Sequence, residues 1–216
     1  MWTCPSRRSM TWKLRLLFLA GLGFLGVAAG STADELVLAP ASSQVTFLLP
    51  ATLHQVHGSF QLVEGRICFD LASHAVAGRI VLDAQSAQTG LASRDRNLKE
   101  TVLDSERFPQ IVFEPERLEV VAQSGDEAQV RLHGEVEIRG LRKPLEIPAH
   151  VTRHAQAIRI QSDFEVPYVA WGLPDPSVFI LKVAPEVSLH LDVQAVIRSQ
   201  GPGLASVAEP TGCPDP

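Results

Sequence analysis

Apolar and polar residues alternate with a period of two along most of the chain, and this pattern predicts strands. In the clearest example, residues 130–139, one face is apolar and the other is charged or polar; the apolar face consists of Val130, Leu132, Gly134, Val136 and Ile138. The same alternation predicts further strands at residues 45–49, 56–62, 67–71, 80–84, 111–120, 145–151, 158–166 and 187–197, with a turn at Gly65.

One polar and one apolar face on every strand is typical of an antiparallel sheet curled around a single interior. We therefore expect an all-β domain with one helix, built as an antiparallel barrel of about eight strands, a size at which side chains fill the interior or enclose one small ligand. The same alternation also fits a two-sheet sandwich.

Residues 89–113 (TGLASRDRNLKETVLDSERFPQIVF) predict the one soluble helix, which a strand follows. Three apolar residues recur at helical spacing and define one face: Leu91, Leu98 and Val102. Arg94 and Asp95 fall on that same face, and partly buried charges usually need partners. We expect Arg94 and Asp95 to be a structural pair that bonds to strand ends, where the helix closes one end of the sheet; a catalytic pair is the alternative.

The two ends of the chain differ from the middle. Residues 1–33 predict a signal peptide, because basic residues precede an apolar run and small residues precede Asp34. The run is short for a membrane span, although an uncleaved anchor is the alternative. Residues 199–216 are rich in Gly, Pro and small residues and predict a disordered tail. Residues 34–198 then form one domain, and we expect a periplasmic or secreted protein.

The net charge of the chain limits the kinds of molecule that it could bind. The whole chain has a net charge of −5, and residues 1–33 hold four basic residues and no acid, so residues 34–216 have a net charge of −9. Such an acidic body argues against nucleic acid and against electrostatic docking on anionic lipid, and no stable membrane insertion is expected after cleavage. The seven histidines lack the spacing of a metal site, so we expect no metal and no cofactor.

Cleavage would leave two cysteines, Cys68 and Cys213. Strand parity places Cys68 on the outer face. A disulfide between them and two unpaired thiols are both open on sequence alone.

A few polar and aromatic residues are candidates for a site. His54 shares strand parity with Val56, so we expect it to lean toward the interior, as a hydrogen-bonding group for a ligand headgroup or as a rim histidine bonded to protein or water. Tyr168 and Trp171 lie in a Pro-rich loop and either line a cavity mouth or cap the core. No Gly-x-Ser-x-Gly motif is present, and we expect no catalytic residues.

The segment T-G-x3-R-D-x2-L, followed by D-x3-F-P-x-I-x-F, resembles the YceI family of bacterial lipid-binding proteins. The matching residues are Thr89, Gly90, Arg94, Asp95, Leu98, Asp104, Phe108, Pro109, Ile111 and Phe113. Residues 43–47 and 56–60 resemble the opening hairpin of the family, and residues 132–144 resemble its second signature.

The resemblance implies a lipocalin-like barrel with an apolar tunnel, in which some members hold an isoprenoid chain such as the tail of a polyprenyl compound or quinone. It implies a carrier for an isoprenoid-type lipid or a quinone-like molecule. The side chains expected around the ligand are Phe47, Phe60, Leu82, Phe113, Val136, Ile138 and Trp171. Residues 166–179 (VPYVAWGLPDPSVF) depart from the short D-F-G-L turn of many members, which predicts a reshaped tunnel mouth.

Two other functions fit the same sequence. A barrel filled solid by side chains would be a structural or protein-interaction module without a ligand. An enzyme acting on a bound lipid would need polar residues that converge inside, for which only His54 and the pair Arg94 and Asp95 are candidates. A homodimer is one of the open oligomeric states.

Overall fold

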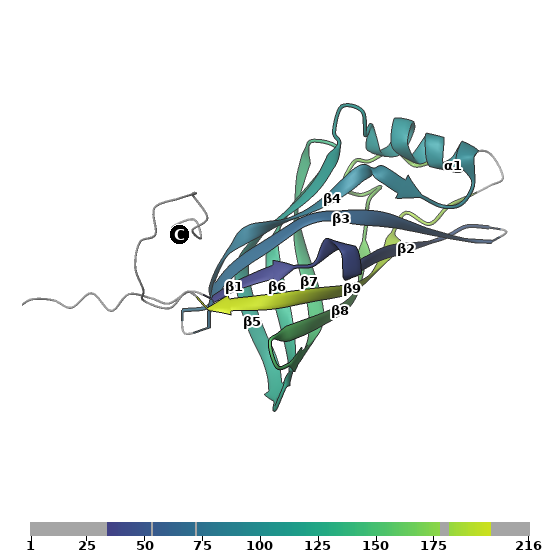
Figure 1. Ribbon diagram of the computed structural model, residues 1–216. Helices are drawn as coiled ribbons and strands as arrows, with labels where there is room; N and C mark the ends of the chain where they lie inside the picture. Colours follow the sequence, from purple (N-terminus) through teal and green to yellow (C-terminus); the bar gives the residue numbers. More distant parts are fainter. Residues whose placement is uncertain (1–33, 53, 72, 178–181, 200–216) are drawn as a thin grey trace, which may run out of the picture. The chain divides into compact units, whose positions relative to one another are not determined.

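The computed structural model describes residues 34–52, 54–71, 73–177 and 182–199, which form a β-barrel with one short helix at one end (Figure 1). The strands are β1 (Asp34–Leu38), β2 (Gln44–Pro50), β3 (Gln55–Asp70), β4 (Ala75–Gln88), β5 (Gln110–Ser124), β6 (Glu127–Ile138), β7 (Leu141–His154), β8 (Ala157–Val166) and β9 (Val187–Ser199). The expected signal peptide lies outside the described residues, and so does the expected tail except for Ser199.

The sheet is antiparallel throughout and closes on itself. The strand order is β1-β3-β2-β9-β8-β7-β6-β5-β4, and β3 also pairs with β4. Both β1 and β2 lie between β3 and β9, one after the other along them. Nine strands therefore occupy eight positions, which confirms the all-β barrel with one helix and excludes the sandwich.

A single turn of 3-10 helix, η1 (Pro40–Ser42), separates β1 from β2. The Ser43 hydroxyl donates to the Ala39 carbonyl oxygen at 2.8 Å and accepts from the Gln194 amide at 3.1 Å. The Ala39 amide donates to the Gln194 carbonyl oxygen at 2.7 Å. These bonds replace the strand-to-strand hydrogen bonds that are missing between β1 and β2. The segment that joins β1 to β2 therefore stays attached to β9.

The turn expected at Gly65 is wrong, because β3 runs through this position as one strand of 16 residues. A Cβ atom at Gly65 would lie 2.2 Å from Leu38 Cδ1. The glycine therefore gives Leu38 of β1 room to pack across the sheet, and its lack of a side chain marks a close contact rather than a chain reversal.

Charged side chains pair along the outer face of the sheet. Arg142 on β7 lies 3.1 Å from Glu114, 3.1 Å from Glu137 and 3.7 Å from Glu135. The negative charges of Glu114 and Glu137 raise the pKa of this guanidinium. Arg159 and Asp192 make a similar pair across β8 and β9 at 2.5 Å. This polar face leaves the apolar residues of each strand for the interior.

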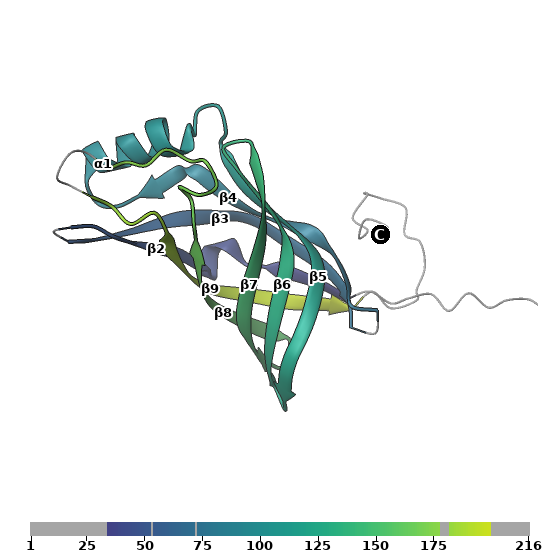
Figure 2. The ribbon, with the colours of Figure 1, turned by 180° about the vertical axis from the view of Figure 1, so that it is seen from behind.

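The helical segment covers one end of the barrel, as the two opposite views show (Figures 1 and 2). It consists of α1 (Ala92–Asn97) and a π-helical segment, η2 (Leu98–Leu103). The expectation that Leu91 lies on the buried face is wrong: it precedes the helix and is 52% exposed. The wider π-turn instead buries both Val102 and Leu103. No helix among the described residues is long and apolar enough to cross a membrane.

Cys68 has the outward parity that the alternation predicts, since its neighbours Ile67 and Phe69 line the interior and it does not. Its side chain is nevertheless buried and disulfide-bonded. Cys213, which the sequence offered as one possible partner, lies outside the described residues.

Candidate functional site

The barrel interior contains a cavity of about 200 Å³ beside the helical segment, which we call the helix-end cavity. Every residue of its wall is aliphatic or aromatic. All seven side chains expected around a ligand line this cavity: Phe47, Phe60, Leu82, Phe113, Val136, Ile138 and Trp171. They come from five different strands and from the loop after β8, so the pleat of the sheet turns them toward one space. Their contact with a ligand stays a prediction.

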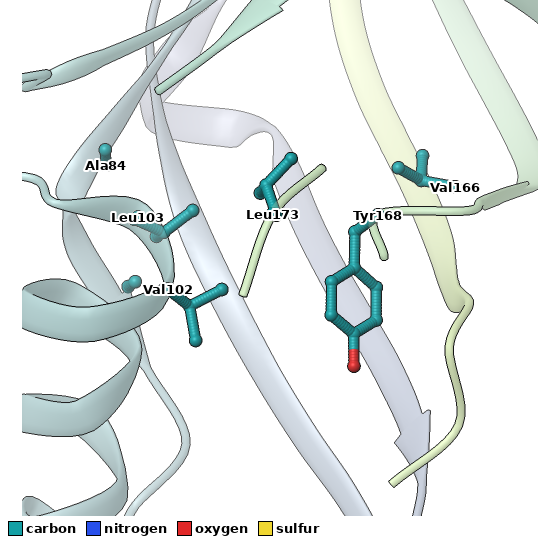
Figure 3. Packing of buried hydrophobic residues seen from close by; sticks show 7 residues of the cluster. Ala84, Val102, Leu103, Val166, Tyr168 and Leu173 are labelled. Carbon is teal, nitrogen blue, oxygen red and sulfur yellow. The ribbon is translucent and has the colours of Figure 1, made fainter. Parts of the chain in front are cut away.

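Buried side chains close the helix-end cavity beneath the helix. Val102 and Leu103 come from η2, and Tyr168 and Leu173 come from the loop after β8; all four are at most 6% exposed. Figure 3 shows Val102 and Leu103 on the helix side of the closure and Tyr168 and Leu173 on the facing side, with Leu103 directed toward Leu173. The loop runs beneath α1 (Figure 2). The closure is therefore apolar packing between two segments that are far apart in sequence.

The loop after β8 folds into tight turns that direct its large residues inward. The Trp171 amide donates to the Pro167 carbonyl oxygen and the Leu173 amide to the Tyr168 carbonyl oxygen, both at 3.0 Å. Gly172 between them has φ of 99°, a conformation that favours glycine. Tyr168 and Trp171 consequently line the cavity, and they also pack over the apolar core at its closed end. The two alternatives, lining a cavity and capping the core, are therefore compatible.

The Tyr168 hydroxyl has a protein partner at this closed end. It donates to the Ala184 carbonyl oxygen at 2.8 Å. Burial, together with the negative charge of Asp175, raises the pKa of Tyr168 to about 12. The phenol is therefore a neutral donor, already bonded, over the whole physiological pH range.

Arg94 and Asp95 attach the helix to the end of β4 through Thr89. Asp95 accepts from the Thr89 amide at 2.7 Å and from the Thr89 hydroxyl. Arg94 donates from Nε to the Thr89 hydroxyl at 2.7 Å and from Nη2 to the Thr89 carbonyl oxygen at 2.9 Å. The hydrogen bond from the Thr89 side chain holds the pKa of Asp95 below its usual value. This geometry is that of a structural anchor.

Arg139 is a second anchor, which sequence reasoning missed. Its Nη1 donates to the carbonyl oxygens of Thr101 and Val102, the latter at 2.9 Å, at the end of η2. Arg139 and Gly140 form the β6–β7 turn with φ of 53° and 72°, the signs that a type I′ turn requires. The turn could be inferred from the residues between two alternating segments, but its contact with η2 could not.

A second cavity of about 260 Å³ lies at the opposite end of the barrel, and we call it the turn-end cavity. Five residues line both cavities and form a belt between them: Leu38, Ile80, Ile147, Leu191 and Val193. Most of the turn-end wall is apolar. Its lining also includes the polar residues Gln123, Asp126, Glu127 and Arg153 at the ends of strands β5 to β7, a group that we call the rim and that sequence reasoning missed.

The expectation that His54 leans into the interior is wrong. Its side chain is exposed and lines neither cavity. His54 lies in the β2–β3 turn, where its carbonyl oxygen accepts from the Ala51 amide at 3.0 Å. Since β3 begins at Gln55, strand parity does not extend to His54. Among the described residues, no group of three His, Cys, Asp or Glu side chains could hold a metal ion.

Comparison with known proteins decides the family. The family model of the YceI-like domain matches residues 36–195, most of the chain. The chain belongs to the YceI-like family. This confirms the resemblance seen in residues 89–113. No curated protein sequence matches the chain.

Solved structures share the fold of this YceI-like protein at low sequence identity. BcnA from Burkholderia cenocepacia is 17% identical with a TM-score of 0.61, over 74% of this chain and 99% of that one. A polyisoprenoid-binding domain from Saccharophagus degradans, implicated in plant cell wall breakdown, is 14% identical with a TM-score of 0.60, over 74% and 97%. A YceI protein from Campylobacter jejuni is 16% identical with a TM-score of 0.55, over 69% and 88%.

Proposed function

We propose that this YceI-like protein binds a lipid with a long isoprenoid-type tail, such as a polyprenyl compound or a quinone-like molecule, inside its barrel. The observation that carries the proposal is the wall of the helix-end cavity, which is built from aliphatic and aromatic side chains alone. The likeness to a polyisoprenoid-binding domain supports the same ligand class.

The energetics of such a site favour a tail over a compact polar molecule. Each methylene group moved from water into an apolar environment contributes about 0.8 kcal/mol. A polar group in the helix-end cavity would lose its hydrogen bonds to water and find no free partner on this wall, which costs free energy. Affinity should therefore grow with the length of the apolar chain.

The role that fits this wall is carriage or sequestration of the lipid rather than its conversion. Acid–base or nucleophilic chemistry needs polar groups within hydrogen-bond reach of the reacting atoms. The Tyr168 hydroxyl of the cavity wall is already bonded to Ala184, and the candidate pair Arg94 and Asp95 is bonded to Thr89 and does not line the cavity.

The leader-like sequence of residues 1–33 supports a place of action in the periplasm or outside the cell. Export with cleavage would leave Asp34 as the first residue. The intact mass of the protein purified from a periplasmic fraction tests this, and a full-length mass in the cytoplasmic fraction would contradict it.

Mass spectrometry of an organic extract tests the ligand. The protein is purified without detergent, and an isoprenoid species at near-stoichiometric yield is expected. Phe60→Trp and Val136→Phe should fill the cavity and lose the extractable lipid while the protein stays folded. Glu135→Phe adds the same ring on the outer face next to Val136 and should keep the lipid. A blank extract from the unaltered protein, together with no uptake of added farnesol, would exclude the proposal.

A further inference from the structure

The two ends of the interior differ in exposure and polarity. At the helix end the closing residues Val102, Leu103, Tyr168 and Leu173 are all buried. At the turn end all four rim residues (Gln123, Asp126, Glu127 and Arg153) are exposed. An amphiphilic molecule that enters such a barrel gains most when its polar end remains at the exposed, polar end.

Charge and hydrogen bonding at the rim define what that polar end can be. The Nε and Nη2 atoms of Arg153 both lie 3.4 Å from Asp126 Oδ1, and its amide donates to the Asp126 carbonyl oxygen at 2.8 Å. Glu127 lies 3.8 Å from His150 on the neighbouring strand. The rim therefore contains two carboxylates and one guanidinium, and that guanidinium is already paired with Asp126, so the rim disfavours an added phosphate. Gln123 and Arg153 still offer donors, and the carboxylates offer acceptors.

We propose that the bound lipid places its headgroup at the rim, with its tail passing the belt into the helix-end cavity, and that this headgroup is an uncharged hydrogen-bonding group rather than a phosphate. A hydroxyl, phenol or carbonyl has this chemistry. The inference rests on the proposed function, because it assigns direction and headgroup class to the same ligand.

Trp171 lines the helix-end cavity and provides a direct test of the direction. The chain has three tryptophans, so Trp2→Phe and Trp12→Phe in the full chain leave Trp171 as the sole emitter. The probes are two methyl stearates that carry a nitroxide either near the tail end or near the ester. The tail-labelled ester should quench Trp171 several-fold more strongly at equal occupancy. Stronger quenching by the ester-labelled probe would reverse the assigned direction, and equal quenching would also overturn it.

Occupancy separates failure of the direction from failure of the proposed function. It is measured independently by displacement of radiolabelled farnesol. If both esters displace farnesol but quench in the wrong order, only the direction is wrong. If neither the esters nor farnesol bind, the proposed function itself fails.

The headgroup class is tested by changing rim charge. The unaltered protein should bind farnesol at least tenfold more tightly than farnesyl diphosphate. Asp126→Asn with Glu127→Gln should raise the ratio of farnesyl diphosphate affinity to farnesol affinity about tenfold, because two repulsive charges are removed. Glu100→Gln with Glu106→Gln makes the same charge change on exposed residues at the helix end and should alter neither ligand. An equal diphosphate gain in both variants, or none in the rim variant, would overturn the assignment.

Discussion

At the scale of single residues, Gly58 shapes the wall of the helix-end cavity. A Cβ atom at this position would lie 2.1 Å from Phe47 Cζ and 2.7 Å from the Gln88 carbonyl oxygen. Because the second contact is with backbone, Gly58→Ala should lower the free energy of unfolding by about 1–3 kcal/mol, measured by urea denaturation. His57→Ala changes the exposed neighbour and should stay within about 0.5 kcal/mol. Equal losses in the two variants would show that Phe47 does not need this space.

Asp95 should make the attachment of the helix depend on pH. Its pKa is lowered in the folded protein, chiefly by the Thr89 hydroxyl. A lowered pKa contributes stability above the unfolded-state value of about 4, and that stability is lost as pH falls through the folded-state pKa. The difference in unfolding free energy between the unaltered protein and Asp95→Asn should therefore be largest near neutral pH and shrink below about pH 4.

NMR titration of the Asp95 carboxyl checks the cause of this pH dependence. Thr89→Val removes the hydroxyl that donates to Asp95, so the pKa of Asp95 should rise toward its usual value. If Thr89→Val leaves that pKa unchanged, the threonine is not the cause of its lowering.

Strand alternation places single residues well only inside strands. It placed Val136 and Phe113 on the cavity wall, because each side chain of a pleated strand points to one of only two faces of the sheet. It misplaced His54, which lies in a turn where the pleat no longer applies. For the same reason the rim residues Asp126 and Arg153 were missed: they come from turns or strand ends, and their proximity depends on the pairing of β6 with β7.

At the scale of elements, the β6–β7 turn supports the helical segment. Arg139 adopts a left-handed conformation that asparagine adopts more readily, while its guanidinium binds carbonyl oxygens at the end of η2. Arg139→Asn should therefore relieve strain in the turn but release η2. We expect little change in global stability and roughly tenfold faster hydrogen exchange in residues 98–105.

Arg142→Asn is the matched control for the helical segment. Arg142 follows the same turn but pairs with Glu114 and Glu137 on the outer face. Its loss should leave exchange in residues 98–105 unchanged. Faster exchange there in both variants would mean that η2 responds to general loosening of the hairpin rather than to the Arg139 contact.

Helices and strands were predicted correctly where one hydrophobic period continued. They were misjudged where a π-turn or a glycine interrupted that period. A helical period predicted the helical segment, but Leu91 lies before its first turn and is exposed, and the π-turn of η2 buries Leu103 as well as Val102. Glycine within a strand was taken as a turn at residue 65, although its role is to admit Leu38. Neither outcome can be derived locally, because each depends on a segment from elsewhere in the chain.

At the scale of the whole molecule, the belt lies between two cavities of different character, and we expect a bound tail to pass it. Barrel closure through β3 and β4 brings the belt residues Leu38, Ile80, Ile147, Leu191 and Val193 around the same cross-section. The alternation predicted that one interior exists. Its division into a closed apolar end and an exposed polar end depends on strand register and stagger, which the sequence pattern leaves open.

Obstructing the belt should therefore limit the length of tail that the protein accepts. Ile147→Phe enlarges a belt side chain that is 9% exposed. In the unaltered protein, affinity should rise from geraniol to farnesol to geranylgeraniol, since each added methylene contributes about 0.8 kcal/mol. In Ile147→Phe that rise should stop once the tail fills the turn-end cavity, so the longest alcohol loses most and the shortest loses little.

Titration calorimetry with the three alcohols separates this outcome from general damage. Glu146→Phe adds the same ring to the exposed neighbour on the outer face and should keep the full rise with chain length. A uniform loss across the three alcohols in Ile147→Phe would indicate a distorted barrel instead of an obstructed path. An unchanged rise would mean that the tail never crosses the belt, and the two cavities would then be separate sites.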